Sequence, residues 1–510
     1  MNYTNIIESK TGLQIPCHNT VSFHSKYNPE KEAETFAAQF SQTSRFFVIL
    51  GICGAYHLLA LKKKFPAAKI IAVEESREDI DFLSHIPQVE SLEKNKDFVL
   101  TDCAGLQAAL LRTYKPQLHG NLIISSIRQW ENTFNESAKK ARDIIAATIK
   151  LISADYSVQS HFGKIWQKNI FGNLALSSRI KQNVAEMLHE VPTEKTAAII
   201  AAGPTLDETS SVLKDKRTEF FVIATDTAYT SLCARSIQPD AVVSVDGQMI
   251  SHAHFFNDTS KNTLFVFDLC ANHSAAKKVL KSGARLIFSQ SKHPLAQYAS
   301  QYTGKNSFIP IETGSGTVTI AAASFAILCG FTKLRFFGAD FSYLNGKSYT
   351  KNTYLDTVYR EHETRIHTTE TSFDRLLFRT ELIRLAQNHY TTEVLESYRS
   401  SLADFLSAHS FAQKSADTFC AQNAPAGDTK TKETTLLAPF DFKDFSSYYA
   451  TQLKNFFSKN SQQDDDDPLV LTLLPLCAWI ENHKKSSKFN YTDSSLLIAY
   501  QQSLRYTEII

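Results

Sequence analysis

The feature that most restricts the possible folds is the segment 196–208, in which a run of apolar residues changes abruptly into a helix start. The apolar run is typical of a buried strand, and Gly203 and Pro204 break it ahead of Thr205. Thr205 and Glu208 have the spacing of a capping box, and Gly203 allows a ligand to approach the backbone. A helix start offers N–H groups and a positive dipole end to an anion. The segment predicts a phosphate-binding corner made by Gly203, Pro204 and Thr205, although an ordinary strand-to-helix turn would explain it equally well if it stood alone.

Four further apolar runs in the same region each end in a carboxylate. We expect strands over 220–224, 241–245, 264–267 and 334–339, followed by Thr225 with Asp226, by Asp246, by Asp268 and by Asp340. The carboxyl ends of parallel strands line one crevice of an open sheet, so these acids are expected to converge on one site. An aspartate at a strand end also serves as a turn residue or a helix cap, and we expect at least one of the four to do only that.

A second glycine corner lies further along the chain and consists of Gly314, Ser315, Gly316 and Thr317. It precedes the apolar segment 318–329, which we expect to be a helix that ends with Gly330 at its C-terminal cap. Small residues ahead of a helix start suit a phosphate or a carboxylate of a ligand. Two such corners in one alternating region favour a binding site there.

The first 150 residues alternate strand and helix as well. A strand is predicted over 46–50, a glycine turn over 51–54, a helix over 57–64 and a second strand over 69–73 that ends at Glu74; later strands are expected at 97–100 and 121–125. Two strands joined by a helical crossover predict a Rossmann-like domain, in which Glu74 stands where such folds hold a ribose. Because the glycine pattern is a loose match, a degenerate domain kept for docking is the other interpretation.

The rest of the chain is predicted to be helical. The sequence between about 131 and 190 has helical spacing and contains Trp166, Asn169 and Asn173. The four acids at 464–467 are expected to form a solvated loop ahead of a helix that starts at Pro468. The predicted domains are therefore a Rossmann-like domain over 1–150, a helical bridge over 151–195, a central domain over 196–395 and a helical domain over 396–510, with a polar linker at 422–434.

Composition excludes several classes of protein. The 510 residues are too many for one core, and 43% apolar with 21% charged residues is ordinary for a globular protein. A net charge of +2 gives no electrostatic case for binding nucleic acid or a membrane surface. The start of the chain does not resemble a signal peptide, and the scattered cysteines have no metal-ligand spacing, so we expect a cytoplasmic protein without structural zinc or disulfides.

Three motifs taken together resemble the Maf family, the motility-accessory-factor glycosyltransferases that modify flagellin. They are GPTLDE at 203–208, the segment 224–248 and the block from Gly314 to Tyr349. The middle region is also similar to the archaeal 6-hydroxymethylpterin pyrophosphokinases, which are called MptE-like. More distantly it is similar to bacterial sialyltransferases that use CMP-sialic acid, in which a GPSL corner, a TSG-type corner and D-F-Y and N-G-x-x-Y motifs build the donor site. The matching residues here are 203–206, 314–316, 340–343 and 345–349.

The resemblance implies an α/β fold with a Rossmann-like N-terminal domain, a central glycosyltransferase-like parallel-sheet domain and an α-helical C-terminal domain. It implies a glycosyltransferase that moves a nonulosonic, sialic-acid-like sugar from a CMP-sugar to serine or threonine of flagellin, with no tightly bound cofactor and no metal. The reaction passes through an oxocarbenium-like state while negative charge builds on the departing phosphate. Helix N-termini and tyrosine hydroxyls stabilise such charge without a metal.

The resemblance also implies roles for individual residues. The two corners hold the nucleotide and the sugar carboxylate, with Thr225, Asp226, Asp246 and Gln248 beside them; Tyr349, with Tyr343, donates to the phosphate, and Asp340 belongs to the catalytic group. The acceptor hydroxyl needs a general base, for which His367 has the expected relative position and His362 comes second. The residues around His367 do not reproduce the sialyltransferase sequence, and many Maf sequences carry a histidine close to where Tyr349 stands.

Two other functions use the same residues differently. A pyrophosphokinase would place ATP phosphates on the glycine corners and hold Mg²⁺ with two carboxylates such as Asp226, Asp246 or Asp340. A non-catalytic flagellar assembly protein would keep the fold without the chemistry, because a fold does not establish an activity. The strand-end acids favour the first alternative, and the flanking domains and the Tyr349 motif favour the glycosyltransferase.

Overall fold

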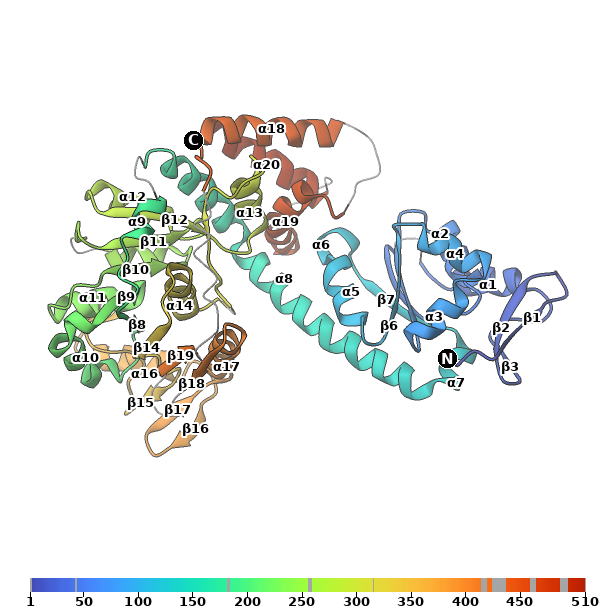
Figure 1. Cartoon of the computed structure of the whole chain (residues 1–510), viewed down its shortest axis with the longest axis horizontal. Coiled ribbons are helices and arrows are strands. Elements are labelled where there is room, and N and C mark those ends of the chain that lie inside the picture. The colour runs from blue at the N-terminus through green and yellow to red at the C-terminus, as the bar shows by residue number, and fades with distance from the viewer. Residues whose placement is uncertain are drawn as a thin grey trace. The chain divides into compact units, whose positions relative to one another are not determined.

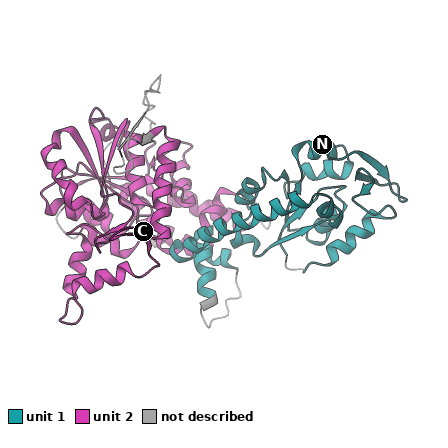
Figure 2. Cartoon of the chain, turned by 90° about the horizontal axis from the view of Figure 1, so that it is seen from below, with its two compact units in different colours: residues 1–163, 463–466, 474–499 teal, residues 164–462, 467–473, 500–510 magenta. Residues whose placement is uncertain are grey.

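The computed structural model describes residues 2–41, 44–180, 184–255, 259–314, 316–413, 420–423, 437–458, 465–486 and 494–509. The chain packs as two compact units, shown in different colours in Figure 2. Unit 1 comprises residues 1–163, 463–466 and 474–499, and unit 2 comprises residues 164–462, 467–473 and 500–510. The predicted division into four domains remains a prediction.

Unit 1 contains a four-stranded parallel sheet in the order β6-β5-β4-β7. Its strands are β4 (Phe46–Leu50), β5 (Lys69–Glu74), β6 (Phe98–Asp102) and β7 (Leu122–Ser126). Every residue of β4 is buried, because helices cover both faces of a parallel sheet. The helix α2 (Tyr56–Lys64) crosses over between β4 and β5. The predicted Rossmann-like arrangement is confirmed.

The remaining elements of unit 1 surround this sheet. A small antiparallel sheet precedes it and was absent from the sequence prediction; its strands are β1 (Asn5–Glu8), β2 (Gln14–His18) and β3 (Val21–Ser22). The helices are α1 (Pro29–Ala38), α3 (Arg77–Leu83), α4 (Pro87–Glu93), α5 (Leu106–Thr113), α6 (Pro116–His119) and α7 (Arg128–Thr133). The long helix α8 (Asn135–Ser177) confirms the predicted helical spacing, and the boundary between the two units falls within it.

Unit 2 is built on a nine-stranded sheet in the order β13-β12-β11-β10-β9-β8-β14-β19-β18 (Figure 1). The parallel strands are β8 (Thr196–Ile200), β9 (Phe220–Thr225), β10 (Ala241–Ser244), β11 (Leu264–Asp268), β12 (Arg285–Gln290), β13 (Ile309–Pro310) and β14 (Lys333–Phe337). Chain order runs outward from β8 to β13 on one side, and β14 then pairs with β8 on the other. The direction of winding thus reverses between β8 and β14, where open α/β sheets place their ligand crevice.

Helices cover the sheet of unit 2 on both faces. They are α9 (Val184–His189), α10 (Leu206–Asp215), α11 (Asp226–Ala234), α12 (His273–Lys281), α13 (Pro294–Gln301) and α14 (Val318–Cys329), with 3₁₀ turns at Arg217–Glu219 and Met249–Phe255. Helix α14 matches the predicted range, and Gly330 closes it in the left-handed conformation, so both predictions are confirmed. It packs with the apolar residues of β8 to β12 into one core.

A small antiparallel sheet in the order β15-β17-β16 follows β14. It consists of β15 (Tyr343–Leu344), β16 (Ile383–Ala386) and β17 (His389–Thr391), and the chain between β15 and β16 forms α15 (Tyr354–Glu361) and α16 (Thr369–Leu377). Leu344 pairs with His389 and Tyr343 with Tyr390. This pairing brings residues far apart in the sequence next to the end of β14.

The C-terminal region is mainly helical, as predicted. Its helices are α17 (Glu393–Ala408), α18 (Phe442–Ser458), α19 (Pro468–Ser486) and α20 (Ser495–Ile509). Two strands that were not predicted, β18 (Phe411–Gln413) and β19 (Cys420–Asn423), extend the large sheet in the antiparallel sense. The predicted linker at 422–434 therefore begins within β19, and its residues 424–434 lie outside the described part of the chain. Across the described ranges, none of the helices is both long enough and apolar enough to cross a bilayer.

Candidate functional site

The first glycine corner lies at the reversal between β8 and β14. The Gly203 N–H donates to the Gly338 carbonyl at 2.8 Å, which joins the ends of the two strands. A Cβ on residue 203 would lie 2.4 Å from Asp340 Oδ2 and 2.5 Å from the Gly338 oxygen. Glycine is required here because another part of the protein approaches the backbone this closely.

The N–H groups of this corner are bonded within the protein. Thr205 N donates to Asp340 Oδ2 at 2.8 Å, and the Thr205 hydroxyl donates to the other carboxylate oxygen. The predicted capping box is wrong, because Thr205 has helical dihedral angles and caps no N–H of α10 with its side chain. The Asp340 carboxylate occupies the corner as an anionic ligand would. A phosphate that bound here would have to take over the bonds of Asp340.

Asp340 also lies beside a histidine that the sequence prediction missed. Burial raises the pKa of Asp340, while its two bonds from Thr205 and the nearby His389 oppose that shift. His389 is half-buried at the start of β17, and its Nε2 lies 2.8 Å from the Ser342 hydroxyl. A histidine with one ring nitrogen bonded has a fixed orientation, which a general base requires.

Tyr349 stands on a loop directly after β15. Its side chain is 36% exposed. Desolvation of the hydroxyl raises the pKa of Tyr349, as do Tyr343 and Tyr359, while Arg379 lowers it. Burial likewise raises the pKa of Tyr343, with Arg379 again opposing. Tyr343 and Tyr349 are thus close to each other and to one cation, and both hydroxyls stay protonated as hydrogen-bond donors at neutral pH.

The other strand-end acids line the same edge of the sheet, as their parallel strands require. Asp226 is buried and accepts from Ser244 at 2.8 Å and from Thr227 N at 2.7 Å. Asp246 accepts from the N–H of the exposed Gln248 at 2.9 Å. Desolvation is the largest cause of the raised pKa of Tyr354, followed by two neighbouring tyrosines. The charges of Asp246 and Asp226 raise this pKa further, so both acids lie close to Tyr354.

Thr225 and Asp268 have mainly structural surroundings. Thr225 is buried as the last residue of β9 and precedes α11. Burial raises the pKa of Asp268 to about 6, against bonds from Cys270 and Ser291. Asp268 therefore fits the structural turn role that we expected for at least one of the strand-end acids.

The second corner precedes α14, which returns across the sheet towards β14. Thr317 is the N-cap, and its hydroxyl accepts from Thr319 N at 3.3 Å. Gly314 and Gly316 both have positive φ angles, which favour glycine. A Cβ on Gly316 would meet nothing within 4 Å, so the backbone there is open to a ligand. Ser315 lies outside the described residues.

The two histidines predicted as the general base lie on exposed surface. His362 is the C-cap of α15, and His367 lies in the turn before α16 with its N–H bonded to Thr364. The role of His367 remains a prediction. The histidine that lies near Asp340 in the structure is His389. The sequence indicated it only weakly, because His389 begins a short strand that is followed directly by a helix start at residue 393.

In unit 1, the expected ribose acid is enclosed. Glu74 accepts from Ile52 N at 3.0 Å, from Tyr3 Oη at 2.9 Å and from Trp130 Nε1. Its side chain is fully buried, and burial raises its pKa to about 7 against these bonds. The Glu74 carboxylate thus bonds to the backbone of the glycine turn and to buried side chains of the protein. These contacts leave no room for a ribose at the carboxylate.

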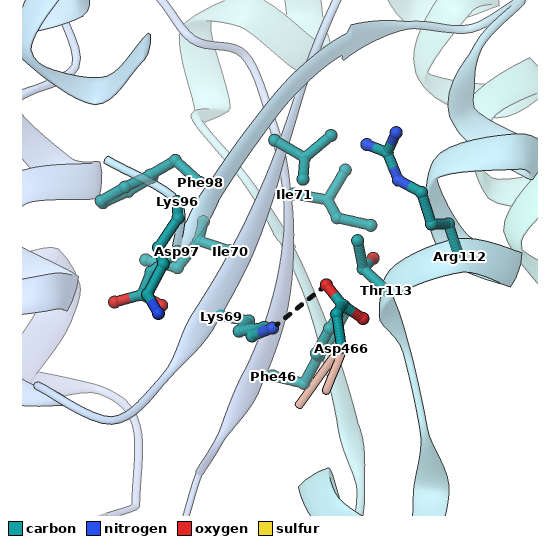
Figure 3. Close-up of a pocket in the computed structure, with 11 residues that line it drawn as sticks. Phe46, Lys69, Ile70, Ile71, Lys96, Asp97, Phe98, Arg112, Thr113 and Asp466 are labelled. Carbon is teal, nitrogen blue, oxygen red and sulfur yellow. Dashed lines mark ion pairs between the residues drawn. The ribbon is translucent and has the colours of Figure 1, made fainter. Parts of the chain in front are cut away.

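A cavity of about 340 Å³ lies in unit 1 at the opposite, amino end of the sheet. Figure 3 shows Lys69 at the start of β5 directed towards Asp466, with Arg112 on another wall. Lys69 lies 3.3 Å from Asp465, and Lys115 lies 2.6 Å from Asp466. Asp466 is 54% exposed in the turn ahead of the next helix, so the predicted solvated loop is confirmed there, although Lys69 and Lys115 pair with it. Asp465 is only 21% exposed, and Asp464 lies outside the described residues. The predicted helix start at Pro468 is confirmed.

Three or more histidine, cysteine, aspartate or glutamate side chains do not gather into a metal-binding group anywhere in the described ranges. Each strand-end acid has hydrogen-bond partners of its own and does not share a ligand position with the other acids. A divalent cation at this edge would therefore have two carboxylates of the protein at most, with other oxygens from substrate or water.

Gly203→Ala tests the close approach of β8 and β14. The added Cβ displaces Asp340 or the Gly338 carbonyl, and we expect a loss of about 1–3 kcal/mol in the free energy of unfolding. Thermal unfolding of the full chain measures it, with Ser211→Ala on the exposed side of α10 as control. Equal stability of the two variants would show that the corner accommodates a Cβ at residue 203, which would contradict the close approach of β8 and β14.

Comparisons with known proteins find a family model that matches part of unit 2. The family model described as 6-hydroxymethylpterin diphosphokinase MptE-like matches residues 168–346. Two proteins of Treponema pallidum (strain Nichols), each named only as an uncharacterized protein, are similar in sequence. One is 33% identical over 144 residues, which are 28% of this chain and 67% of the relative. The other is 30% identical over 246 residues, which are 48% of this chain and 75% of the relative.

One solved structure is similar over most of the chain. It is described as a MAf glycosyltransferase from Magnetospirillum magneticum AMB-1. The alignment covers 99% of this chain and 86% of that one, with 13% identity and a TM-score of 0.48. A likeness of this size does not by itself establish a shared activity.

Proposed function

This chain belongs to the same family as the two Treponema pallidum proteins and contains an MptE-like domain, and from that premise we propose that it is a glycosyltransferase. More specifically, we propose a Maf-type enzyme that moves a nonulosonic acid from CMP to serine or threonine hydroxyls of flagellin in the cytoplasm. The Gly203, Gly314 and Tyr349 motifs support this more specific proposal.

The observation that carries the proposal is the group at the reversal between β8 and β14. The carboxylate of Asp340 lies on the N–H and hydroxyl of Thr205, and His389 lies next to it with its ring held by Ser342. The N–H and hydroxyl of Thr205 thus bind an anionic group, and an oriented histidine lies beside that group. Stabilisation of an anion and a general base are the two contributions that transfer from a phosphate ester to a hydroxyl requires.

The chemistry assigns each proton and bond. The bond between the anomeric carbon and the phosphate oxygen of the donor breaks, and CMP leaves with the electron pair. The acceptor oxygen forms the new bond to the anomeric carbon while its proton passes to His389. Asp340 stabilises the imidazolium that results, and Tyr349 donates a hydrogen bond to the departing phosphate. No step in this sequence requires a metal or a tightly bound cofactor.

A second candidate function follows from the family description. A pyrophosphokinase would bind ATP and Mg²⁺ at the ends of the neighbouring strands β9 and β10, where Asp226 and Asp246 lie. Mg²⁺ commonly uses one or two protein carboxylates together with substrate phosphates, so these two acids are sufficient in number.

Nucleotide binding separates the two functions. We expect calorimetric titration of the full chain to give CMP binding that persists in EDTA and weakens about tenfold in Tyr349→Phe, because one hydrogen bond to a phosphate is lost. The matched control is Tyr27→Phe, whose exposed ring lies in unit 1. Binding of ATP alone, abolished by EDTA and by Asp226→Asn, would contradict the glycosyltransferase proposal in favour of the kinase.

A further inference from the structure

Asp207, on the first turn of α10, bonds to the loop that carries Tyr349. Its Oδ1 atom accepts from the Lys351 N–H at 3.1 Å and from the Thr350 hydroxyl. Lys347 lies 3.5 Å from the other carboxylate oxygen. One carboxylate thus contacts this loop on both sides of Tyr349.

Arg235 completes the arrangement from the end of α11. One guanidinium nitrogen donates to Asp207 at 2.5 Å and to the Thr350 hydroxyl at 2.9 Å. The other donates to the Lys351 carbonyl at 3.2 Å. A guanidinium donates in several directions of one plane, so Arg235 binds the acid and the loop together, which a lysine ammonium would do less well.

The surroundings make this pair stronger than a surface ion pair. The Asp207 and Arg235 side chains are 18% and 16% exposed. Burial would raise the pKa of Asp207, but its bonds to Thr350 and Lys351 and the charge of Arg235 lower it overall, so the carboxylate stays ionised at neutral pH. Thr350 is 1% exposed, and its N–H donates to the Ala202 carbonyl at 2.9 Å.

The other end of the loop is held separately. Leu344 pairs with His389, and the Asn345 N–H donates to the Asn388 carbonyl at 2.8 Å. Tyr349 therefore lies on a short segment bound at one end to the strand of His389 and at the other to the Gly203 corner. The contacts of the neighbouring residues therefore fix the backbone of Tyr349 without a hydrogen bond from the Tyr349 hydroxyl.

We propose that Asp207 and Arg235 are positioning residues that hold Tyr349 in place between the Gly203 corner and His389. The proposal rests on the proposed function for its catalytic consequence, and on the contacts alone for its structural part. Misplacement of a catalytic group by a fraction of an ångström is costly, because the hydrogen bond to the leaving group must form in the transition state.

Hydrogen exchange tests the structural part without any substrate. In Asp207→Asn we expect the amides of Thr350 and Lys351 to exchange about 10 to 100 times faster than in the wild type, because charge-assisted bonds are lost. Arg235→Lys keeps the charge and is expected to fall between the two. Asp215→Asn, an exposed acid at the end of the same helix, is the control and leaves exchange unchanged. Unchanged exchange in Asp207→Asn would overturn the proposal.

Steady-state kinetics of the sugar transfer test the catalytic part. Asp207→Asn is expected to lower kcat about 10- to 100-fold and to raise KM for the donor by no more than the roughly tenfold loss of CMP binding expected of Tyr349→Phe, since Tyr349 is displaced rather than removed. Faster exchange with an unchanged kcat would overturn the positioning role. If the wild type transfers no sugar, the proposed function fails, and the exchange result still decides whether the pair holds the loop.

Discussion

His389→Gln lowers kcat for sugar transfer by about 10²- to 10⁴-fold, the range expected when a general base is removed. Glutamine retains a hydrogen-bonding group for Ser342 but cannot take the proton of the acceptor hydroxyl. Donor binding is expected to change little, because the corners and Tyr349 are untouched. The measurement is the initial rate of transfer at saturating donor, together with the dissociation constant of CMP by calorimetry.

His367→Gln is the matched control for this prediction. The His367 side chain is exposed in the turn before α16, so its loss is expected to leave kcat within about twofold of the wild type. Loss of activity in His367→Gln together with full activity in His389→Gln would contradict the assignment. The base would then be the histidine that the family resemblance indicates.

Glu74→Gln lowers the free energy of unfolding of unit 1 by about 2–4 kcal/mol, because buried donors lose their acceptor. One carboxylate oxygen of Glu74 accepts from Ile52 N and Tyr3, and the other accepts from Trp130. An amide nitrogen in either position faces a donor with another donor. The change in the unfolding transition of unit 1 within the full chain measures the effect, with the exposed Glu34→Gln as control.

The pH dependence of the same transition follows from the raised pKa of Glu74. Since the folded state binds this proton up to a pH of about 7 and the unfolded state releases it near 4.5, stability from this group is greatest at low pH and falls as the pH rises through that window. The total change is on the order of 3 kcal/mol. Glu74→Gln removes this dependence; a variant with the wild-type pH profile would contradict the assignment.

The strands of both parallel sheets were predictable because their residues are almost continuously apolar. The predicted strand 46–50 is β4 itself, and the predicted helix 318–329 is α14. Burial on both faces removes the need for alternation and leaves a strong signal in a short window. The strand-end acids were placed at one edge correctly for the same reason, since parallel strands bring their carboxyl ends together.

Contacts between distant segments could not be predicted in this way. Asp340 on Thr205 links residues 135 positions apart, and it replaces the capping box that local spacing indicated. His389 reaches the site through the pairing of β15 with β17, two short strands with weak patterns. Glu74 was recognised as a strand-end acid, but its enclosure depends on Tyr3 and Trp130, which lie in other parts of unit 1.

The most direct test of the central claim is a transfer assay with purified components. The full chain is incubated in EDTA with CMP-sialic acid as the probe donor and flagellin as the acceptor, and flagellin peptides are analysed by mass spectrometry. We predict one or more peptides whose serine or threonine has gained the mass of the sugar, with CMP released in equal amount, and neither product with His389→Gln. Unmodified flagellin and intact donor, with ATP consumed instead when Mg²⁺ and a hydroxymethylpterin are supplied, would contradict the claim.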